Sequence, residues 1–388
     1  MQHLLVTRDF LPEMRGAARR YTALVRRYPE PMLVSTVAVR ESPRHDLAED
    51  YSIERQRFSR DAASSAGSRM LWRRWVLRRC RGRIHVLHAG DICVTGRIVH
   101  RVHKRLRTPY VVYVSPGSLA TAQTMLARGS LGRRAVRLVL GDAAGVIATT
   151  DEVASRARDM MKDLGISQPA PVAAIGLGTD PVLFGPGRDT GALRARWGIR
   201  RAPIMLTVAR LVAEKGQDSG IEALSLLRHE FPNLRYILVG EGPDEARLRN
   251  LAADMNVMDR VGFAGSMRDD ELPEAYATAT IYLDASRLAP DAGEGLGMSL
   301  IEAAAAGLPV VAFGGSGVTP PLPVLEGRVS VASGDTRAVA DAIGSLLRDS
   351  ERRNEMGMLG RESAETYLDW NRVAQDTARF VRECVAHG

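Results

Sequence analysis

Residues 294–311 read EGLGMSLIEAAAAGLPVV, a pattern that indicates a loop, a helix and a buried strand in succession. Gly295 and Gly297 let the backbone approach a ligand with no side chain between them. The helix formers after Gly297 predict a helix that ends at Gly307, where an apolar strand begins. Because the first turn of a helix presents backbone N–H groups and a positive dipole end, this helix suits a bound phosphate.

Two carboxylates accompany the predicted helix, Glu294 just before it and Glu302 within it. With this spacing, one carboxylate is expected to face a sugar on one side of the phosphates and the other a ribose on the opposite side. The competing interpretation is an ordinary strand–helix unit, in which Glu294 is a solvated loop residue and Glu302 a surface residue of the helix.

The two glutamates, the Gly-Leu-Gly that follows the first and the Ala-x-Gly-Leu-Pro-Val-Val that follows the second resemble the donor site of family 4 glycosyltransferases. The resemblance implies an α/β fold of the GT-B type, with two Rossmann-like doubly wound domains facing a central cleft. It also implies that Glu294 is catalytic and steadies the transferred sugar. The donor-binding residues implied in this stretch are Gly295, Gly297, Met298, Ser299 and Glu302.

A second motif follows the predicted strand 204–209, where Arg210 and Lys215 flank a loop that opens a helix. Both cations are able to reach one diphosphate, the arginine with a planar fork and the lysine as a point charge. This pair is similar to the family's diphosphate-binding pair, so Arg210 and Lys215 are assigned to catalysis with Glu294. Two solvated loop cations are the alternative.

The nucleobase is expected near the turn that ends the strand 260–265, because relatives of this kind present backbone groups there. Phe263, Ser266 and Met267 are the candidate residues. The following Tyr282–Ser286 run predicts the strand that leads into the glutamate loop.

In the front half, the segment after the first strand carries Arg15 and Gly16 where the family usually has paired glycines near the donor phosphates. The loop after residues 110–114 carries Ser115 and Ser118 where relatives commonly place a histidine and an acidic residue near the sugar. These serines are able to hydrogen-bond sugar hydroxyls, or to serve as turn residues only. Arg15 either contributes its charge near the donor phosphates or to the acceptor, or is only a solvated residue at the start of the helix.

Alternating apolar runs and helical segments predict two α/β domains with parallel sheets. The first is expected at residues 1–183 and binds the acceptor, and the second at 184–369 binds the nucleotide sugar. A helix within 370–388 is expected to cross back to the first domain. The polar span 40–65 predicts a long loop without regular structure.

Net charge is +8, with 30 Lys+Arg against 16 Asp+Glu in residues 1–180 and 23 against 29 in the remainder. The basic front half indicates an anionic partner, or only a solvated face. The basic helix around 69–80 has Trp72, Trp75 and Val76 on one face and suits an anionic membrane surface, or a packing role in which Leu71, Trp75 and Val76 contact the sheet. Cys80, Cys93 and Cys384 lack metal-ligand spacing, so we expect a reduced, cytoplasmic setting and no metal site.

The resemblance implies a retaining hexosyltransferase with a nucleotide sugar as co-substrate, UDP being the expected carrier, and no further cofactor is expected. The acceptor is expected to be a small molecule, with an aminocyclitol intermediate of an aminoglycoside antibiotic as the specific hypothesis. Alternatives are a lipid acceptor approached through peripheral membrane contact, and a nucleotide-sugar-binding protein without transfer activity. Nucleic-acid binding is not expected, because no nucleic-acid-binding module is evident. The sequence leaves the sugar and the oligomeric state open.

Overall fold

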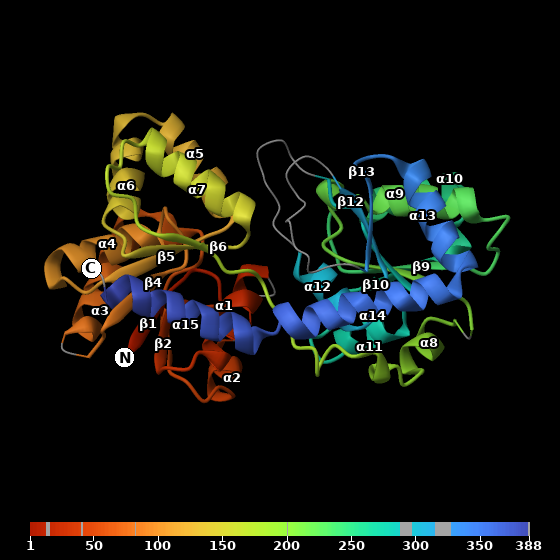
Figure 1. Cartoon of the computed structure of the whole chain (residues 1–388), viewed down its shortest axis with the longest axis horizontal. Helices are drawn as coiled ribbons and strands as arrows, with labels where there is room; N and C mark the ends of the chain where they lie inside the picture. Colours follow the sequence, from red (N-terminus) through yellow and green to blue (C-terminus); the bar gives the residue numbers. More distant parts are fainter. Residues whose placement is uncertain are drawn as a thin grey trace. The chain divides into compact units, whose positions relative to one another are not determined.

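A computed structural model describes residues 1–12, 16–39, 42–81, 83–199, 201–287, 297–314 and 327–386. These residues divide into two compact units, one formed by 1–177 with 370–386 and the other by 178–287 with 297–369. Each unit is built on its own parallel β-sheet (Figure 1).

The first unit has a seven-stranded sheet in the order β3-β2-β1-β4-β5-β6-β7. Every strand pair in it is parallel. The helices and strands, in chain order, are β1 His3–Val6, α1 Gly16–Arg27, β2 Met32–Val37, α2 Ser42–Leu47, β3 Ile53–Gln56, α3 Ala66–Cys80, β4 Val86–Ala89, α4 Thr95–Leu106, β5 Tyr110–Val114, α5 Pro116–Ala127, α6 Ser130–Gly141, β6 Gly145–Ala148, α7 Asp151–Asp163, β7 Val172–Ala174 and α15 Trp370–Ala386.

Helices cover both faces of this sheet. On one face, α3 to α7 bury apolar side chains against alternate strand residues such as Leu4, Leu87 and Val112. On the other face, α1 lies beside α15, which also contacts β6. That second face also carries polar side chains: His3 Nδ1 lies 2.9 Å from His88 Nε2, and His88 Nδ1 lies 3.1 Å from the Tyr113 hydroxyl. Because these rings hydrogen-bond to one another, the sheet is able to bury them without the full cost of lost hydration.

The second unit has a six-stranded parallel sheet in the order β10-β9-β8-β11-β12-β13. Its core on one face is formed by α9, α10 and α13 with the sheet, while α12 packs against α14. The helices and strands are α8 Ala192–Arg196, β8 Ile204–Val208, α9 Gln217–Leu227, β9 Arg235–Val239, α10 Glu245–Asp254, β10 Val261–Gly265, α11 Leu272–Thr278, β11 Ile281–Asp284, α12 Met298–Ala305, β12 Val310–Gly314, β13 Arg328–Ala332, α13 Thr336–Arg348 and α14 Ser350–Tyr367.

Both sheets contain a point at which the strand order reverses. In the first sheet it lies between β1 and β4, and in the second between β8 and β11. Ligands of open α/β sheets bind outside the carboxyl ends of strands at such a switch point, because the two flanking loops diverge there. The topology therefore directs attention to the loops after β1 and β4 and to those after β8 and β11. The prediction of an α/β protein with two doubly wound sheets is confirmed.

Two predictions about local structure are wrong. The span 40–65 is not a loop throughout, because its described residues include α2, the sheet strand β3 and a short 3₁₀ turn. Val34 pairs with Ile53 and gives β3 its place at the sheet edge. The hydrophobic alternation that normally reveals a strand is weak in IERQ, since an edge strand buries little.

The predicted packing of the basic helix α3 is wrong at Leu71, which is 57% exposed. The face formed by Trp72, Trp75 and Val76 does pack: Trp72 and Val76 are completely buried and Trp75 lies against the core. The indole N–H of Trp72 donates a hydrogen bond of 2.8 Å to Ser35 Oγ, so the buried ring has a partner for its polar group.

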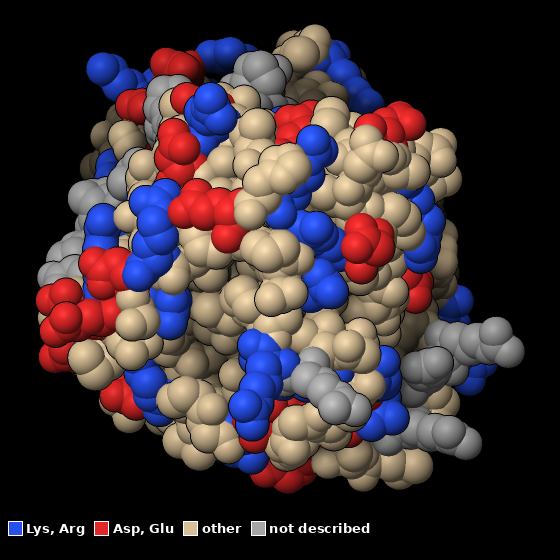
Figure 2. Space-filling model, turned by 90° about the vertical axis from the view of Figure 1, so that its right-hand side faces the viewer, with Lys and Arg blue, Asp and Glu red and all other residues tan. Residues whose placement is uncertain are grey.

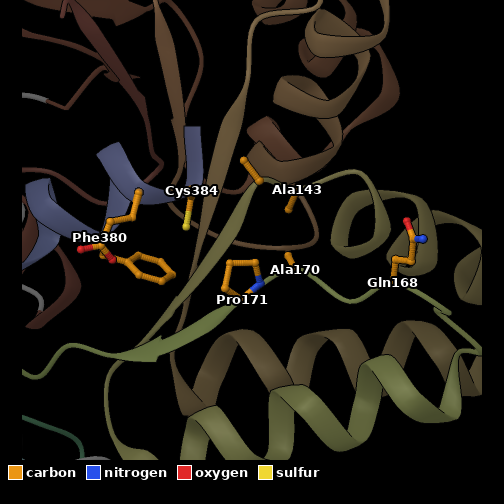
Figure 3. Close-up of a pocket in the computed structure, with 8 residues that line it drawn as sticks. Ala143, Gln168, Ala170, Pro171, Phe380 and Cys384 are labelled. Carbon is orange, nitrogen blue, oxygen red and sulfur yellow. The ribbon is translucent and has the colours of Figure 1, made fainter. Parts of the chain in front are cut away.

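Helix α15 belongs to the first unit and is held at its two faces. Arg382 donates a 2.8 Å hydrogen bond to Glu30, and Cys384 lies against Gly145, where a Cβ atom would stand 2.6 Å from its Sγ. Figure 3 shows a shallow pocket of about 380 Å³ beside this contact, at the amino-terminal end of β6. Burial raises the pKa of Cys384 to about 11, so the thiol stays protonated and serves packing.

Candidate active site

The loops on either side of the second switch point carry most of the predicted donor site. Arg210 follows β8, and Lys215 ends a short 3₁₀ turn, Ala213–Lys215, that precedes α9. The Arg210 side chain is 72% exposed, and it pairs with the carboxylate of Glu214 at 3.7 Å. Lys215 is half-buried. An exposed guanidinium at the carboxyl end of a strand is available to a diphosphate.

Close backbone contacts fix this loop in place. Gly216 has a φ of 65°, and a Cβ atom there would lie 1.9 Å from the carbonyl oxygen of Ala285, which follows β11. The N–H of Arg287 donates a 2.7 Å hydrogen bond to the Glu214 carbonyl, and the Arg287 side chain pairs with Asp218 at 2.8 Å. The loops after β8 and β11 are thus joined directly, which brings both flanks of the switch point together.

Gly216→Ala is expected to destabilise the second unit, because the added Cβ meets backbone and the φ value is unfavourable for a residue with a side chain. We expect the free energy of unfolding to fall by about 2–4 kcal/mol. Chemical denaturation followed by circular dichroism measures the change. Gly187→Ala is the matched control, since nothing lies within 4 Å of its Cβ position. Equal stability of the two variants would contradict the close approach at Gly216.

Helix α12 begins on the other flank, with Gly297 as the residue before its first turn. Met298 and Ser299 form that first turn, whose N–H groups have no partner inside the helix. Position 297 faces Asp284, at the end of β11, because a Cβ atom on Gly297 would lie 3.8 Å from its Oδ2. Helix α12 begins where the sequence predicted a helix, and anion binding at its first turn stays a prediction. Glu294 and Gly295 lie outside the described residues.

Glu302 lies on the buried side of α12, with only 3% of its surface exposed. The hydroxyl of the fully buried Tyr276 donates a 2.9 Å hydrogen bond to its Oε2. The alternative of an exposed helix residue is therefore wrong. This hydrogen bond fixes the orientation of the Glu302 carboxylate. Binding of a ribose hydroxyl by Glu302 stays a prediction, because it requires a lone pair that the hydrogen bond from Tyr276 does not use.

Two groups beside α12 were missed by the sequence interpretation. Asp284 ends the buried run of β11, and its Oδ1 accepts a 3.1 Å hydrogen bond from the N–H of Ser286. Tyr282, from the same strand, forms a side-chain hydrogen bond with Ser299. Burial, together with the negative charge of Asp284, raises the pKa of Tyr282. A carboxylate directly after an apolar strand was the available signal for Asp284, whereas nothing in the sequence distinguishes Tyr282 from a core residue.

Of the predicted nucleobase residues, Phe263 lies within β10, and Ser266 and Met267 directly follow it; β10 is two strands from β8 in the same sheet. The Phe263 ring packs against the core and is covered by Arg249, whose guanidinium carbon lies 4.1 Å from the ring centroid. Met267 is buried, and the exposed Ser266 donates its N–H to Glu241 at 3.3 Å. Because Phe263 and Met267 serve packing, Ser266 and the nearby backbone are the groups at this end of the sheet that remain accessible.

In the first unit, the predicted residues gather at the carboxyl ends of β1, β4 and β5. Gly16 opens α1, with nothing within 4 Å of its Cβ position, whereas Arg15 lies outside the described residues. Ser115 caps α5 by accepting a 3.3 Å hydrogen bond from the N–H of Ser118. The Ser118 hydroxyl accepts one of 3.4 Å from Ile92. Both serines therefore have local structural partners, and any contact with a sugar stays a prediction.

Arg20 is a further candidate in the first unit that the sequence interpretation did not single out. It is 5% exposed, and its guanidinium carbon lies 5.4 Å from the Tyr113 ring centroid and 5.9 Å from that of Tyr21. Within the described ranges it forms no ion pair with a carboxylate. The Tyr21 hydroxyl donates a 2.6 Å hydrogen bond to the carbonyl oxygen of Gly90, which follows β4 at the first switch point. A guanidinium held over aromatic rings beside this edge is suited to a polar acceptor.

Two absences concern the described residues only. In them, no group of three or more His, Cys, Asp or Glu side chains is arranged to hold a metal ion. Among their helices, none combines the length and apolar character needed to cross a bilayer.

Comparisons with known proteins agree with this geometry. Residues 189–363 match the family model "Glycosyl transferases group 1". A GDP-mannose-dependent alpha-(1-6)-phosphatidylinositol monomannoside mannosyltransferase of Mycobacterium tuberculosis (strain CDC 1551 / Oshkosh) is 35% identical over 209 residues, which are 53% of this chain and 54% of that protein. A 2-deoxystreptamine glucosyltransferase of Streptomyces kanamyceticus is 29% identical over 69% of this chain and 68% of its own. The chain thus spans about half the length of the first of these relatives.

Among solved structures, Anabaena HepE in complex with UDP and glucose has a TM-score of 0.78 at 19% identity, covering 99% of this chain and 100% of that one. The structural neighbours are GT-B glycosyltransferases, and the likeness at this identity shows the fold. The chain therefore has the GT-B fold, and its residues 189–363 carry a domain of the group 1 glycosyl transferases.

Proposed function

We propose that the protein is a retaining glycosyltransferase that moves a sugar from a nucleoside diphosphate to a hydroxyl group of an acceptor. The observation that carries the proposal is the second switch point, where Arg210, Lys215 and the first turn of α12 lie on loops joined through Gly216 and Ala285. Cations and a helix start at one sheet edge are the groups that stabilise a departing diphosphate.

In the proposed reaction, the acceptor oxygen forms a bond to the anomeric carbon as the bond from that carbon to the diphosphate breaks. The acceptor proton passes to the leaving phosphate oxygen on the same face, so the anomeric configuration is retained. Arg210, Lys215 and the N–H groups of Met298 and Ser299 hold the charge that develops on the diphosphate. Glu294 holds the sugar hydroxyls, and Glu302 accepts from the ribose. The chain needs no further cofactor in this scheme.

UDP is the proposed nucleotide, supported by the fold's likeness to a structure that contains UDP and glucose. GDP is the competitor, since a relative named as GDP-mannose-dependent matches about half of the chain. The proposed acceptor is a small aminocyclitol, supported by the name of the Streptomyces relative, because 2-deoxystreptamine is an aminocyclitol. A lipid acceptor is the second candidate, supported by the name of the mycobacterial relative and by the basic surface of the first unit.

A screen of nucleotide sugars by thermal unfolding tests the donor. A donor present at about 100 times its Kd adds about 2.7 kcal/mol of stability, because it binds only the native state. We expect UDP-sugars to raise the melting temperature by several degrees and GDP-mannose to raise it less. The Arg210→Ala variant is expected to lose most of this shift.

The best donor is then incubated with 2-deoxystreptamine or with phosphatidylinositol, and the glycosylated product is identified by mass spectrometry. Stabilisation by a donor with neither transfer nor donor hydrolysis would instead identify a nucleotide-sugar-binding protein. The absence of stabilisation by every nucleotide sugar would refute the proposed donor site.

A further inference from the structure

The first unit contains an unusually one-sided charge distribution. Between Ala66 and Gly141, the span of α3, α4, α5 and α6, the sequence has fifteen arginines and one lysine. The single acidic residue in this span is Asp91, which is buried and bonded to the start of α4. Solvent-facing helices of soluble proteins usually mix both signs, so this composition requires a physical explanation.

The fold directs these cations to one surface. The inner sides of α3, α4 and α6 pack on the sheet through side chains such as Trp72, Ile98 and Val136. The helices contact one another in the order α3, α4, α6. Their outer sides carry arginines at helical spacing, namely Arg74 and Arg78 on α3, Arg101 and Arg105 on α4, and Arg134 on α6, all of them exposed. We call this surface the α3–α4–α6 face.

Like charges on this face are held close together without neutralisation. Partial burial, followed by the charges of Arg97 and Arg101 on α4, lowers the pKa of Arg69 on α3. Arg79 and Lys104 have carboxylate partners in Glu54 and Asp142, but the exposed arginines named above form no ion pair with any described carboxylate. A cluster of this kind repels itself, so an anionic partner stabilises it.

The second unit shows that this pattern is not a general property of the protein. On the face of that unit seen in Figure 2, blue and red side chains lie interspersed. Several of its exposed arginines pair locally, as in Arg247 with Asp244 at 2.8 Å and Arg249 with Glu245 at 2.8 Å. Residues 181–388 contain 23 Lys+Arg against 29 Asp+Glu, so the excess of cations belongs to the front half of the chain.

Large apolar side chains are exposed among the arginines. Leu131, at the start of α6, is 82% exposed, and Leu71 on α3 is 57% exposed next to Met70 at 48%. Apolar residues placed between cations are typical of a helical surface that lies in the interface of an anionic bilayer. A surface for single-stranded nucleic acid would instead expose aromatic rings for stacking, and on α3 Trp72 is buried while Trp75 lies under Arg79.

We propose that the α3–α4–α6 face binds the surface of an anionic phospholipid bilayer, with its arginines at the lipid phosphates and Leu71 and Leu131 inserted among the headgroups. The proposal stands whether or not the acceptor is itself a lipid, because it depends only on the charge and exposure of this face.

Co-sedimentation of the full chain with vesicles tests the proposal. We expect the triple variant Arg97→Glu, Arg101→Glu, Arg105→Glu to bind phosphatidylcholine vesicles that contain 30% phosphatidylglycerol at least about a hundredfold more weakly. Each of the three lost positive charges near the surface accounts for roughly fivefold, and the added negative charges repel the anionic bilayer further. Added salt is expected to weaken wild-type binding as well. The Leu71→Ser, Leu131→Ser variant keeps all charges and is expected to bind more weakly than wild type.

The matched control carries the same charge reversals on the second unit, at the exposed residues Arg201, Arg337 and Arg352. It is expected to bind vesicles as tightly as wild type. Circular dichroism checks that each variant is folded, which is expected because all the substituted residues lie at the surface. If both triple variants bound the vesicles equally weakly, binding would depend on the net charge of the protein and not on this face, and the proposal would be overturned. Binding to a duplex RNA but not to the vesicles would also overturn it, in favour of nucleic acid.

Discussion

Glu294→Ala is expected to abolish sugar transfer while leaving nucleotide binding largely intact. The resemblance of residues 294–311 to a retaining donor site assigns this carboxylate to the sugar hydroxyls, away from the nucleotide. Its loss leaves the diphosphate held by Arg210, Lys215 and α12, so the donor still binds but the hexose is no longer oriented for attack. Misplacement of a reacting group by about 1 Å is enough to cost about a hundredfold in rate.

Two measurements separate these effects. Isothermal titration with UDP reports nucleotide binding, and release of sugar from the donor, to acceptor or to water, reports the chemistry. Glu294→Gln keeps an acceptor oxygen but removes the charge, so intermediate activity is expected. Glu245→Ala, on the exposed side of α10 in the same unit, is the matched control. A Glu294→Ala protein with undiminished transfer would refute the assignment of the site.

Replacing both Arg210 and Lys215 with alanine is expected to lower kcat by at least about 10³-fold. Each cation stabilises negative charge that builds on the diphosphate only as the glycosidic bond breaks, and one such contact contributes on the order of 10²-fold. The loss is expected to be less than the product of two single substitutions, because both residues act on one group. Nucleotide affinity is expected to fall as well.

Single-turnover kinetics at saturating donor measures this change in the chemical step. Glu214→Gln is the informative control, because Glu214 is the carboxylate that pairs with Arg210 at 3.7 Å. Freeing the guanidinium from that pair is expected to leave activity unchanged or modestly raised. Should the double alanine variant transfer sugar at the wild-type rate, the second switch point is not where the reaction occurs.

The sequence determined the repeating α/β pattern and the places where chemistry is concentrated. Apolar runs such as 110–114 form the strands because they are buried on both faces of a parallel sheet, which demands continuous hydrophobicity. Gly307 ends α12 with a φ of 76°, as its type predicts. Arg210 and Lys215 were assigned from their place beside a strand–helix loop and from the resemblance, and their role at a diphosphate stays a prediction.

Only the tertiary structure decided which groups share an edge and which side chains are buried. Strand order, not chain order, places β8 beside β11, so the Arg210 loop meets the α12 loop through Gly216 and Ala285 across about seventy residues. Glu302 became a buried partner of Tyr276 for the same reason. The separation of arginines onto one face also arises from packing, because the position of Trp72 in the core fixes which side of α3 meets solvent.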